Sequence, residues 1–144
     1  MIDPQTRKKL IALVRKQVVP AIGCTEPICV ALACARATEK LQALTGRTGL
    51  VPSRIDVRLS ANILKNAMGV GIPGTGMVGL PIAIALGALI GKSEYGLEVL
   101  RDCSPEAVER GRKFIDEGRI DIRLATAEDF ERSSVTPDEK LFVD

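Results

Sequence analysis

The stretch Gly69-Val-Gly-Ile-Pro-Gly-Thr-Gly-Met77, followed by an apolar run over residues 78–90, decides the fold of this chain. Glycine adopts positive φ without strain and lets a backbone approach a ligand closely, so a tight turn is expected here. If a helix follows directly, its free N–H groups and its dipole favour a carboxylate or a phosphate. The pattern therefore predicts a small-anion cradle formed by Gly74, Thr75 and Gly76.

Two other interpretations of this stretch are weighed beside the cradle. The segment Gly74-Thr-Gly-Met-Val-Gly79 also satisfies the dinucleotide fingerprint, but that fingerprint requires a second strand ending in an acid about 20 residues on. Residues 91–100 instead resemble a turn with a short apolar segment. A phosphate-binding P-loop is excluded because Thr75 stands where it needs a lysine. A purely structural turn stays open.

Outward from this stretch, the chain predicts an α+β domain with about four helices and a small sheet. Helices are expected over residues 4–19 and 28–44, over the apolar run to Ile90, and from Ser104-Pro105 to a stop at Gly118. Two segments, Arg54-Ile-Asp-Val-Arg-Leu59 and Arg119-Ile-Asp-Ile-Arg-Leu124, alternate apolar and charged residues as half-exposed strands do. They are either independent strands or partners in one sheet.

Composition fits one domain over residues 1–144 and narrows the classes of function. The formal charge is +2 and only 3% of residues are aromatic, so nucleic acid is not an expected partner. The chain has no histidine, which excludes Ser-His-Asp and Cys-His catalysis within it. The apolar run is too short and too rich in glycine to span a bilayer. We expect no membrane partner and a cytoplasmic location.

Cys24 differs from the other three cysteines in its surroundings. Cys29, Cys34 and Cys103 form no C-x-x-C pair and are expected to fill space in the interior. Cys24 directly precedes a helix start, where unpaired N–H groups would stabilise a thiolate and lower the pKa of the thiol. It is a candidate base or nucleophile, although it could also simply pack.

Three motifs in order resemble a known family. They are Ala21-Ile-Gly-Cys-Thr-Glu-Pro27, Ser60-Ala-Asn-Ile-Leu-Lys-Asn66 and Gly71-Ile-Pro-Gly-Thr-Gly76, with Gly87 after them. Over about residues 10–125 the chain resembles the N-terminal part of the L-cysteine desulfidase family and its uncharacterised bacterial relatives. These in turn resemble the alpha chain of iron–sulfur L-serine dehydratases. Members are several hundred residues long, so the chain corresponds to about their first third.

The resemblance implies a lyase that needs no PLP and uses a [4Fe-4S] cluster to release pyruvate and ammonia from L-cysteine or L-serine. It implies that Cys24 is the base or is associated with the cluster. Gly74, Thr75 and Gly76 would hold the substrate carboxylate, and Asn62, Lys65 and Asn66 would face the same pocket. The cluster ligands are expected mostly outside this chain, which would be inactive without the missing C-terminal part; a homo-oligomer is left open.

Two alternatives to this lyase are kept. The chain could be a non-catalytic module for small-anion binding or assembly, which needs the glycine cradle but no reactive thiol. A weaker alternative makes Lys65 a Schiff-base lysine for PLP, because PLP enzymes catalyse the same elimination.

Overall fold

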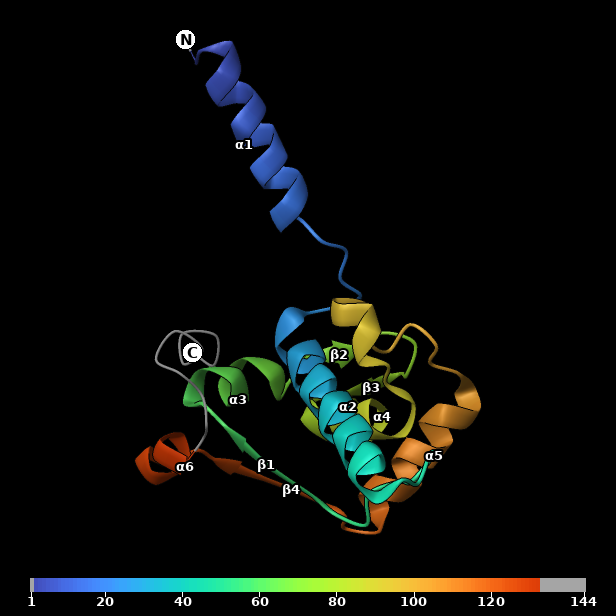
Figure 1. Cartoon of the computed structure of the whole chain (residues 1–144). Helices are drawn as coiled ribbons and strands as arrows, with labels where there is room; N and C mark the ends of the chain where they lie inside the picture. The colour runs from blue at the N-terminus through green and yellow to red at the C-terminus, as the bar shows by residue number, and fades with distance from the viewer. Residues whose placement is uncertain (1, 133–144) are drawn as a thin grey trace.

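Helix α4, Leu80–Ile90, lies at the centre of the computed structural model, which describes residues 2–132. Eight of its residues are buried, and α2, Thr25–Thr45, and α5, Pro105–Asp116, pack against it (Figure 1). Ile82 and Leu86 join one core cluster, whereas Leu80 and Ile84 join a second. The four-residue spacing within each pair gives α4 two apolar faces, so a single helix supports both halves of the interior.

The contact between α2 and α4 depends on glycine. A Cβ placed on Gly87 would lie 2.3 Å from the carbonyl oxygen of Ala31 and 2.8 Å from its Cα. Only a residue without a side chain permits this approach. The helix-forming alanines of α2 complete the close contact, and Gly46 ends α2 in the left-handed conformation.

The two repeated segments are partners in one sheet, which was one of the two interpretations of their sequence. Strand β1, Ile55–Leu59, pairs in parallel with β4, Ile120–Leu124, so that equivalent residues stand side by side. The apolar residues of β1 pack on the second core cluster together with Ile120 and Ile122. Leu124 was expected on the same face but is 53% exposed, because it lies at the end of the strand beyond that cluster.

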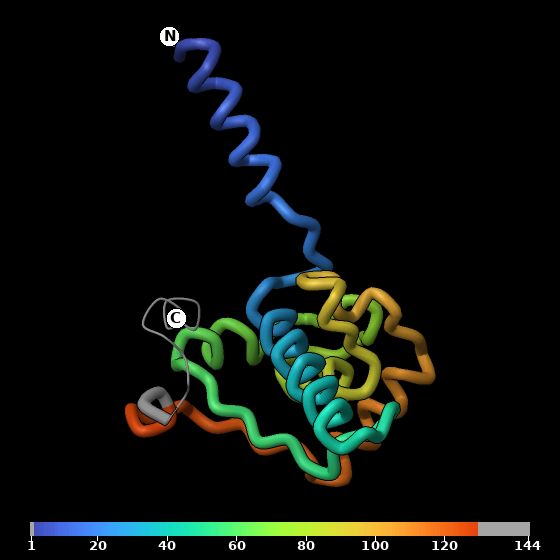
Figure 2. The backbone as a smooth tube through the Cα atoms, in the orientation of Figure 1, coloured from blue at the N-terminus to red at the C-terminus, as the bar shows by residue number. Residues whose placement is uncertain are grey.

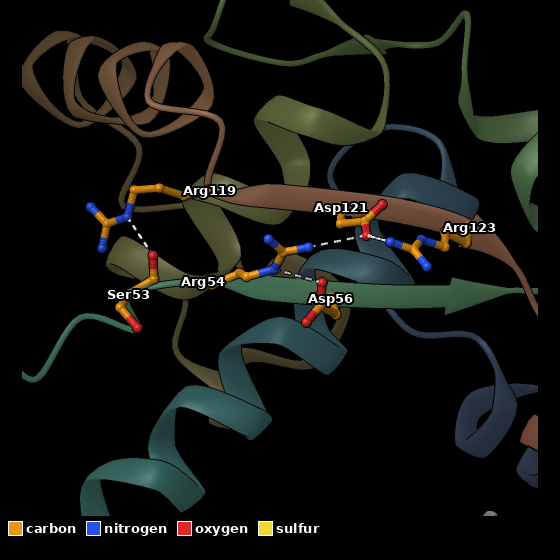
Figure 3. Close-up of polar contacts among 6 residues, drawn as sticks. All are labelled: Ser53, Arg54, Asp56, Arg119, Asp121 and Arg123. Atoms are coloured by element: carbon orange, nitrogen blue, oxygen red, sulfur yellow. Dashed lines mark hydrogen bonds and ion pairs between the residues drawn. The ribbon is translucent and has the colours of Figure 1, made fainter.

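The opposite face of this sheet carries charges in an unfavourable order. The parallel register places Asp56 beside Asp121 and Arg58 beside Arg123, and like charges on adjacent strands repel each other. Arg54 reduces the repulsion by pairing with both Asp56, at 2.9 Å, and Asp121, at 3.2 Å (Figure 3). Arg123 also contacts Asp121.

The glycine-rich stretch forms a hairpin rather than the start of a helix. Strand β2, Gly71–Ile72, pairs antiparallel with β3, Met77–Val78, and α4 begins only at Leu80. The expectation that the turn leads directly into the apolar helix is therefore wrong by these few residues. The hydroxyl of Thr75 donates to the carbonyl of Ile72 at 2.7 Å and accepts from the N–H of Met77 at 2.9 Å. These bonds close the hairpin.

The other elements are shorter or lie apart. They are α1, Pro4–Gln17; α3, Ala61–Ala67; a 3₁₀ helix η1, Ser93–Glu98; and α6, Ala127–Arg132. Helix α1 projects from the rest of the molecule and has no buried residue (Figure 2). Within residues 2–132, no helix is long and apolar enough to cross a membrane.

The α+β class is confirmed, and the four expected helices are present. Helix α1 ends at Gln17, close to its expected end, and α5 begins after the Ser104 cap as expected. Helix α2 begins at Thr25, three residues earlier than expected, because Pro27 sits in the first turn, where its missing N–H has no partner to lose.

Replacing Gly87→Ala should lower the free energy of unfolding by about 1–3 kcal/mol, because the added methyl group overlaps the backbone of α2. Gly69→Ala is the matched control. A Cβ there meets nothing within 4 Å and φ is not positive, so stability should change by less than about 1 kcal/mol. Urea denaturation of both variants measures the difference. Equal free energies of unfolding for the two variants would show that α2 and α4 can move apart to accept the methyl group without loss of stability.

Candidate functional site

Cys24 caps the N-terminus of α2, and its thiol is hydrogen-bonded to a neighbouring carboxylate. The thiol donates to Oε2 of Glu26 at 3.1 Å, and the hydroxyl of Thr25 donates to the same oxygen at 3.3 Å. Cys24 is exposed. The side chain of Cys24 does not bond to the first-turn N–H groups of α2. The thiol therefore faces a carboxylate rather than the helix backbone.

This arrangement reverses the expected shift of the thiol pKa. The hydrogen bond to Glu26, helped by desolvation and by the charge of the same carboxylate, raises the pKa of Cys24. The hydrogen bond from Cys24 in turn lowers the pKa of Glu26. The prediction of a depressed thiol pKa is wrong because the hydrogen bond to the Glu26 carboxylate, together with desolvation and its negative charge, outweighs the partial positive charge of the helix end. At neutral pH the proton stays on sulfur and the charge on Glu26.

Helix α3 brings two of the expected polar residues to this pair. A hydrogen bond with the Asn66 side chain also lowers the pKa of Glu26. The Asn66 amide lies 3.5 Å from Oδ1 of Asn62, the long limit for a hydrogen bond. Lys65 is exposed one residue before Asn66, and its spacing from Asn62 puts it on the same side of α3. The structure thus joins Cys24 and Asn66 through Glu26, and Asn62 lies beside Asn66.

The hairpin meets the segment before Cys24. A Cβ placed on Gly23 would lie 2.8 Å from Cγ of Pro73, and Gly23 has φ +88°. Only glycine suits this turn, which holds residues 22–24 against the hairpin. Gly74 and Gly76 also have positive φ, and a Cβ on either would meet nothing within 4 Å. The hairpin tip is therefore open beside the Cys24 segment. That the Cys24 thiol itself lies close to the tip stays a prediction.

The anion cradle at a helix N-terminus is not what these residues form. Thr75 is buried and its hydroxyl is bonded within the hairpin. The first turn of α4 contains Pro81, which has no N–H. A Cβ on Gly79 would lie 2.7 Å from the carbonyl oxygen of Met68, so another backbone segment already covers this helix end. A ligand at Gly74 and Gly76 would therefore not be held by the N-terminus of α4.

Sequence reasoning missed Glu26. It stands inside the Gly23-Cys-Thr-Glu-Pro27 motif, and its signal was its place in the first turn of α2, two residues after the thiol. A carboxylate is favoured there by the helix dipole. Because Glu26 is a stronger acid than the Cys24 thiol, it is the group that carries the negative charge at this helix end.

The described residues do not fit an iron–sulfur cluster. Within residues 2–132, no group of three or more His, Cys, Asp or Glu side chains comes together in a way that could hold a metal ion, whereas such clusters are held by about three or four thiolates. Cys34 is buried, and burial raises the pKa of its thiol to about 12. Burial also raises the pKa of Cys103. These two thiols are packing residues, as expected, whereas Cys29 is exposed, so the expectation that it fills space in the interior is wrong.

Comparison with known proteins finds relatives that share one name. A UPF0597 protein of Bacteroides fragilis is 68% identical over 82% of this chain and 26% of its own length. UPF0597 proteins of Bacteroides thetaiotaomicron and Oleidesulfovibrio alaskensis are 66% and 51% identical, over 86% and 87% of the chain and 27% of their own lengths. The chain therefore spans about a quarter of the relatives it matches. No family model and no solved structure matches it.

These relatives correct the family resemblance drawn from the motifs. The similar proteins carry the name UPF0597 protein, and none of them carries a cysteine desulfidase or serine dehydratase name. The three motifs are therefore better explained as features shared with UPF0597 proteins, a name that states no activity, substrate or cofactor. The assignment of this chain to the desulfidase and dehydratase families is withdrawn.

Glu26→Gln should lower the pKa of Cys24, because the amide carries no charge to oppose the thiolate. More thiolate forms at any pH below the native pKa, so alkylation by iodoacetamide at pH 8 should become faster. Labelling across a pH series, read by mass spectrometry at each cysteine, measures the shift. Glu109→Gln on α5 is the control and should leave Cys24 labelling unchanged. An unaltered midpoint in Glu26→Gln would mean that the carboxylate does not govern the thiol.

Proposed function

We propose that this chain is part of a lyase that acts on L-cysteine or L-serine by β-elimination, with Cys24 and Glu26 as its proton-transfer pair. The observation that carries the proposal is the 3.1 Å hydrogen bond between the exposed Cys24 thiol and the Glu26 carboxylate. Such a pair holds one proton and one negative charge at neutral pH. It can therefore accept a proton and donate one within a single cycle.

The steps balance without any further acid or base. The Glu26 carboxylate takes the α-proton, the electrons of that bond form the Cα–Cβ double bond, and the β-substituent leaves with its bonding pair. Cys24 gives its proton to the leaving sulfide or hydroxide. The proton on Glu26 then returns to the Cys24 thiolate across the 3.1 Å hydrogen bond. The aminoacrylate product tautomerises and hydrolyses in water to pyruvate and ammonia.

Residues beside the pair supply donors for the substrate carboxylate. Lys65 carries a positive charge on the same side of α3 as Asn62, and Asn66 reaches the Glu26 carboxylate. Gly74 and Gly76 leave the hairpin tip accessible. Charge-assisted hydrogen bonds from an ammonium group to a carboxylate are about twice as strong as neutral ones. We therefore propose that Lys65 binds the substrate carboxylate. In this role Lys65 is not a Schiff-base lysine for PLP.

A [4Fe-4S] cluster in the complete protein would take most of its ligands from outside this chain, because the described residues offer no cluster of ligands. The free thiols suit a reducing compartment, and the proposed location is the cytoplasm. A non-catalytic module for small-anion binding is the second candidate. It is favoured by the open hairpin tip beside the Cys24 segment, because anion binding there needs no proton-transfer pair.

The test uses a chimera in which this chain replaces the matched 124 residues of the Bacteroides thetaiotaomicron relative. Under anaerobic conditions, with and without added iron and sulfide, the chimera should release pyruvate from L-cysteine or L-serine. Cys24→Ala and Glu26→Gln should each lower kcat by about 10²–10⁴. Cys103→Ala, which removes a packing thiol, should not change kcat.

Two results would count against the lyase. Unchanged turnover in both site variants would remove Cys24 and Glu26 from the chemistry. Absence of pyruvate from both the chimera and the unaltered relative, with either amino acid binding measurably by calorimetry, would favour the anion-binding module.

A further inference from the structure

We propose that the free edge of strand β1, together with the apolar groove beside it, is the docking site for a β-strand supplied by the part of the relatives' chain that this chain does not span. The inference concerns assembly and does not depend on the proposed lyase chemistry. It rests on an incomplete sheet, an exposed groove on one edge of that sheet, and the length of the relatives.

The sheet is too small to be complete. Among the described residues β1 pairs only with β4, in parallel. Parallel strands occur almost only in larger sheets covered on both faces, and three or more strands are usually needed for independent stability. Like charges stand beside each other across this pair, which weakens it further. Additional strands are the usual way in which such a pair becomes stable.

The hydrogen bonds show which groups of β1 are available. Ile55 donates its N–H to the carbonyl of Arg119, and the carbonyl of Leu59 accepts from the N–H of Ala125, both at 2.8 Å. In a parallel pair, alternate residues of one strand bond to the same neighbour. The N–H and C=O groups of Asp56 and Arg58 therefore point to the other edge, where no described strand lies. This edge is an open template for another strand.

A groove of about 530 Å³ lies along this edge. Residues 54–59 line one side of it, and no residue of β4 contributes. The other side is α2, whose Cys29, Ala33, Ala37 and Leu41 line the groove although all four are exposed. Their four-residue spacing forms one apolar stripe along the helix. Figure 1 shows α2 and β1 running beside each other with β4 beyond β1.

These features define the chemistry of the occupant. It is an extended strand whose backbone pairs with Asp56 and Arg58 and whose apolar side chains enter the groove against α2. Its other face lies next to the charged face of β1 (Figure 3). Side chains of opposite sign opposite Asp56 and Arg58 would provide the complementary pairs that β4 does not.

The relatives identify where this strand comes from. Those from Bacteroides fragilis and Bacteroides thetaiotaomicron extend over nearly four times the part matched by this chain. A second copy of this chain is the competing occupant. It would place β1 against β1 and should act only at high protein concentration, so the two sources are separable.

Hydrogen exchange of single amides tests the edge directly, in this chain alone and in the chimera with the remainder of the Bacteroides thetaiotaomicron protein. The amides of Asp56 and Arg58 should exchange at least about a hundredfold more slowly in the chimera. Val57 and Leu59, whose amides face β4, are internal controls and should be protected in both. Equal exchange at Asp56 and Arg58 in the two proteins would overturn the proposal. Protection in the chain alone that grows with its concentration would assign the edge to a second copy.

Substitution in the groove gives a second test with a matched control. In the chain alone, Ala33→Glu and Ala37→Glu change exposed residues and should shift Tm by less than about 2 °C. In the chimera they would bury an unpaired charge and should lower Tm by about 5 °C or more. Ala43→Glu on the same helix, outside the groove, should have no effect in either protein. Equal Tm values for all three variants of the chimera would exclude docking against α2.

Discussion

The close approach of α2 to α4 is the contact on which the rest of this structure depends. It exists because Gly87 has no side chain where the backbone of Ala31 passes. Once α2 is fixed there, its N-terminus carries Cys24 and Glu26 to a defined place, and its length provides the wall of the groove beside β1. The candidate site and the candidate docking surface therefore both depend on the contact between α2 and α4.

The same helix shows how a local charge overrides a general rule. A helix N-terminus carries about half a positive charge, spread over several N–H groups. Glu26 carries a full charge and accepts a hydrogen bond from the Cys24 thiol at 3.1 Å. The hydrogen bond to this carboxylate, followed by desolvation and the charge of Glu26, raises the pKa of Cys24. A thiol at a helix start is therefore not reactive by position alone, and its neighbours within one turn have to be counted first.

Much of the fold could be predicted from local patterns. Helix boundaries followed caps and prolines, and the alternation in the two repeated segments gave both strands and their apolar face. Their pairing could only be offered as one of two interpretations, because alternation says nothing about partners. The hairpin at residues 71–78 was missed because two-residue strands produce no period, and a bonded Thr75 looks the same in sequence as one that faces a ligand.

The candidate site was predictable in most of its residues, although not in Glu26, and it was not predictable in its chemistry. Cys24, Asn62 and Asn66 were singled out from motifs, and the structure links Cys24 and Asn66 through Glu26, with Asn62 beside Asn66. The direction of the thiol pKa required knowing which way the Glu26 side chain turns, which no spacing rule supplies. The hairpin contact between Gly23 and Pro73 is also non-local. The sequence therefore indicates most of the side chains of the site, whereas the packing between α2, α3 and the hairpin determines what those side chains can do.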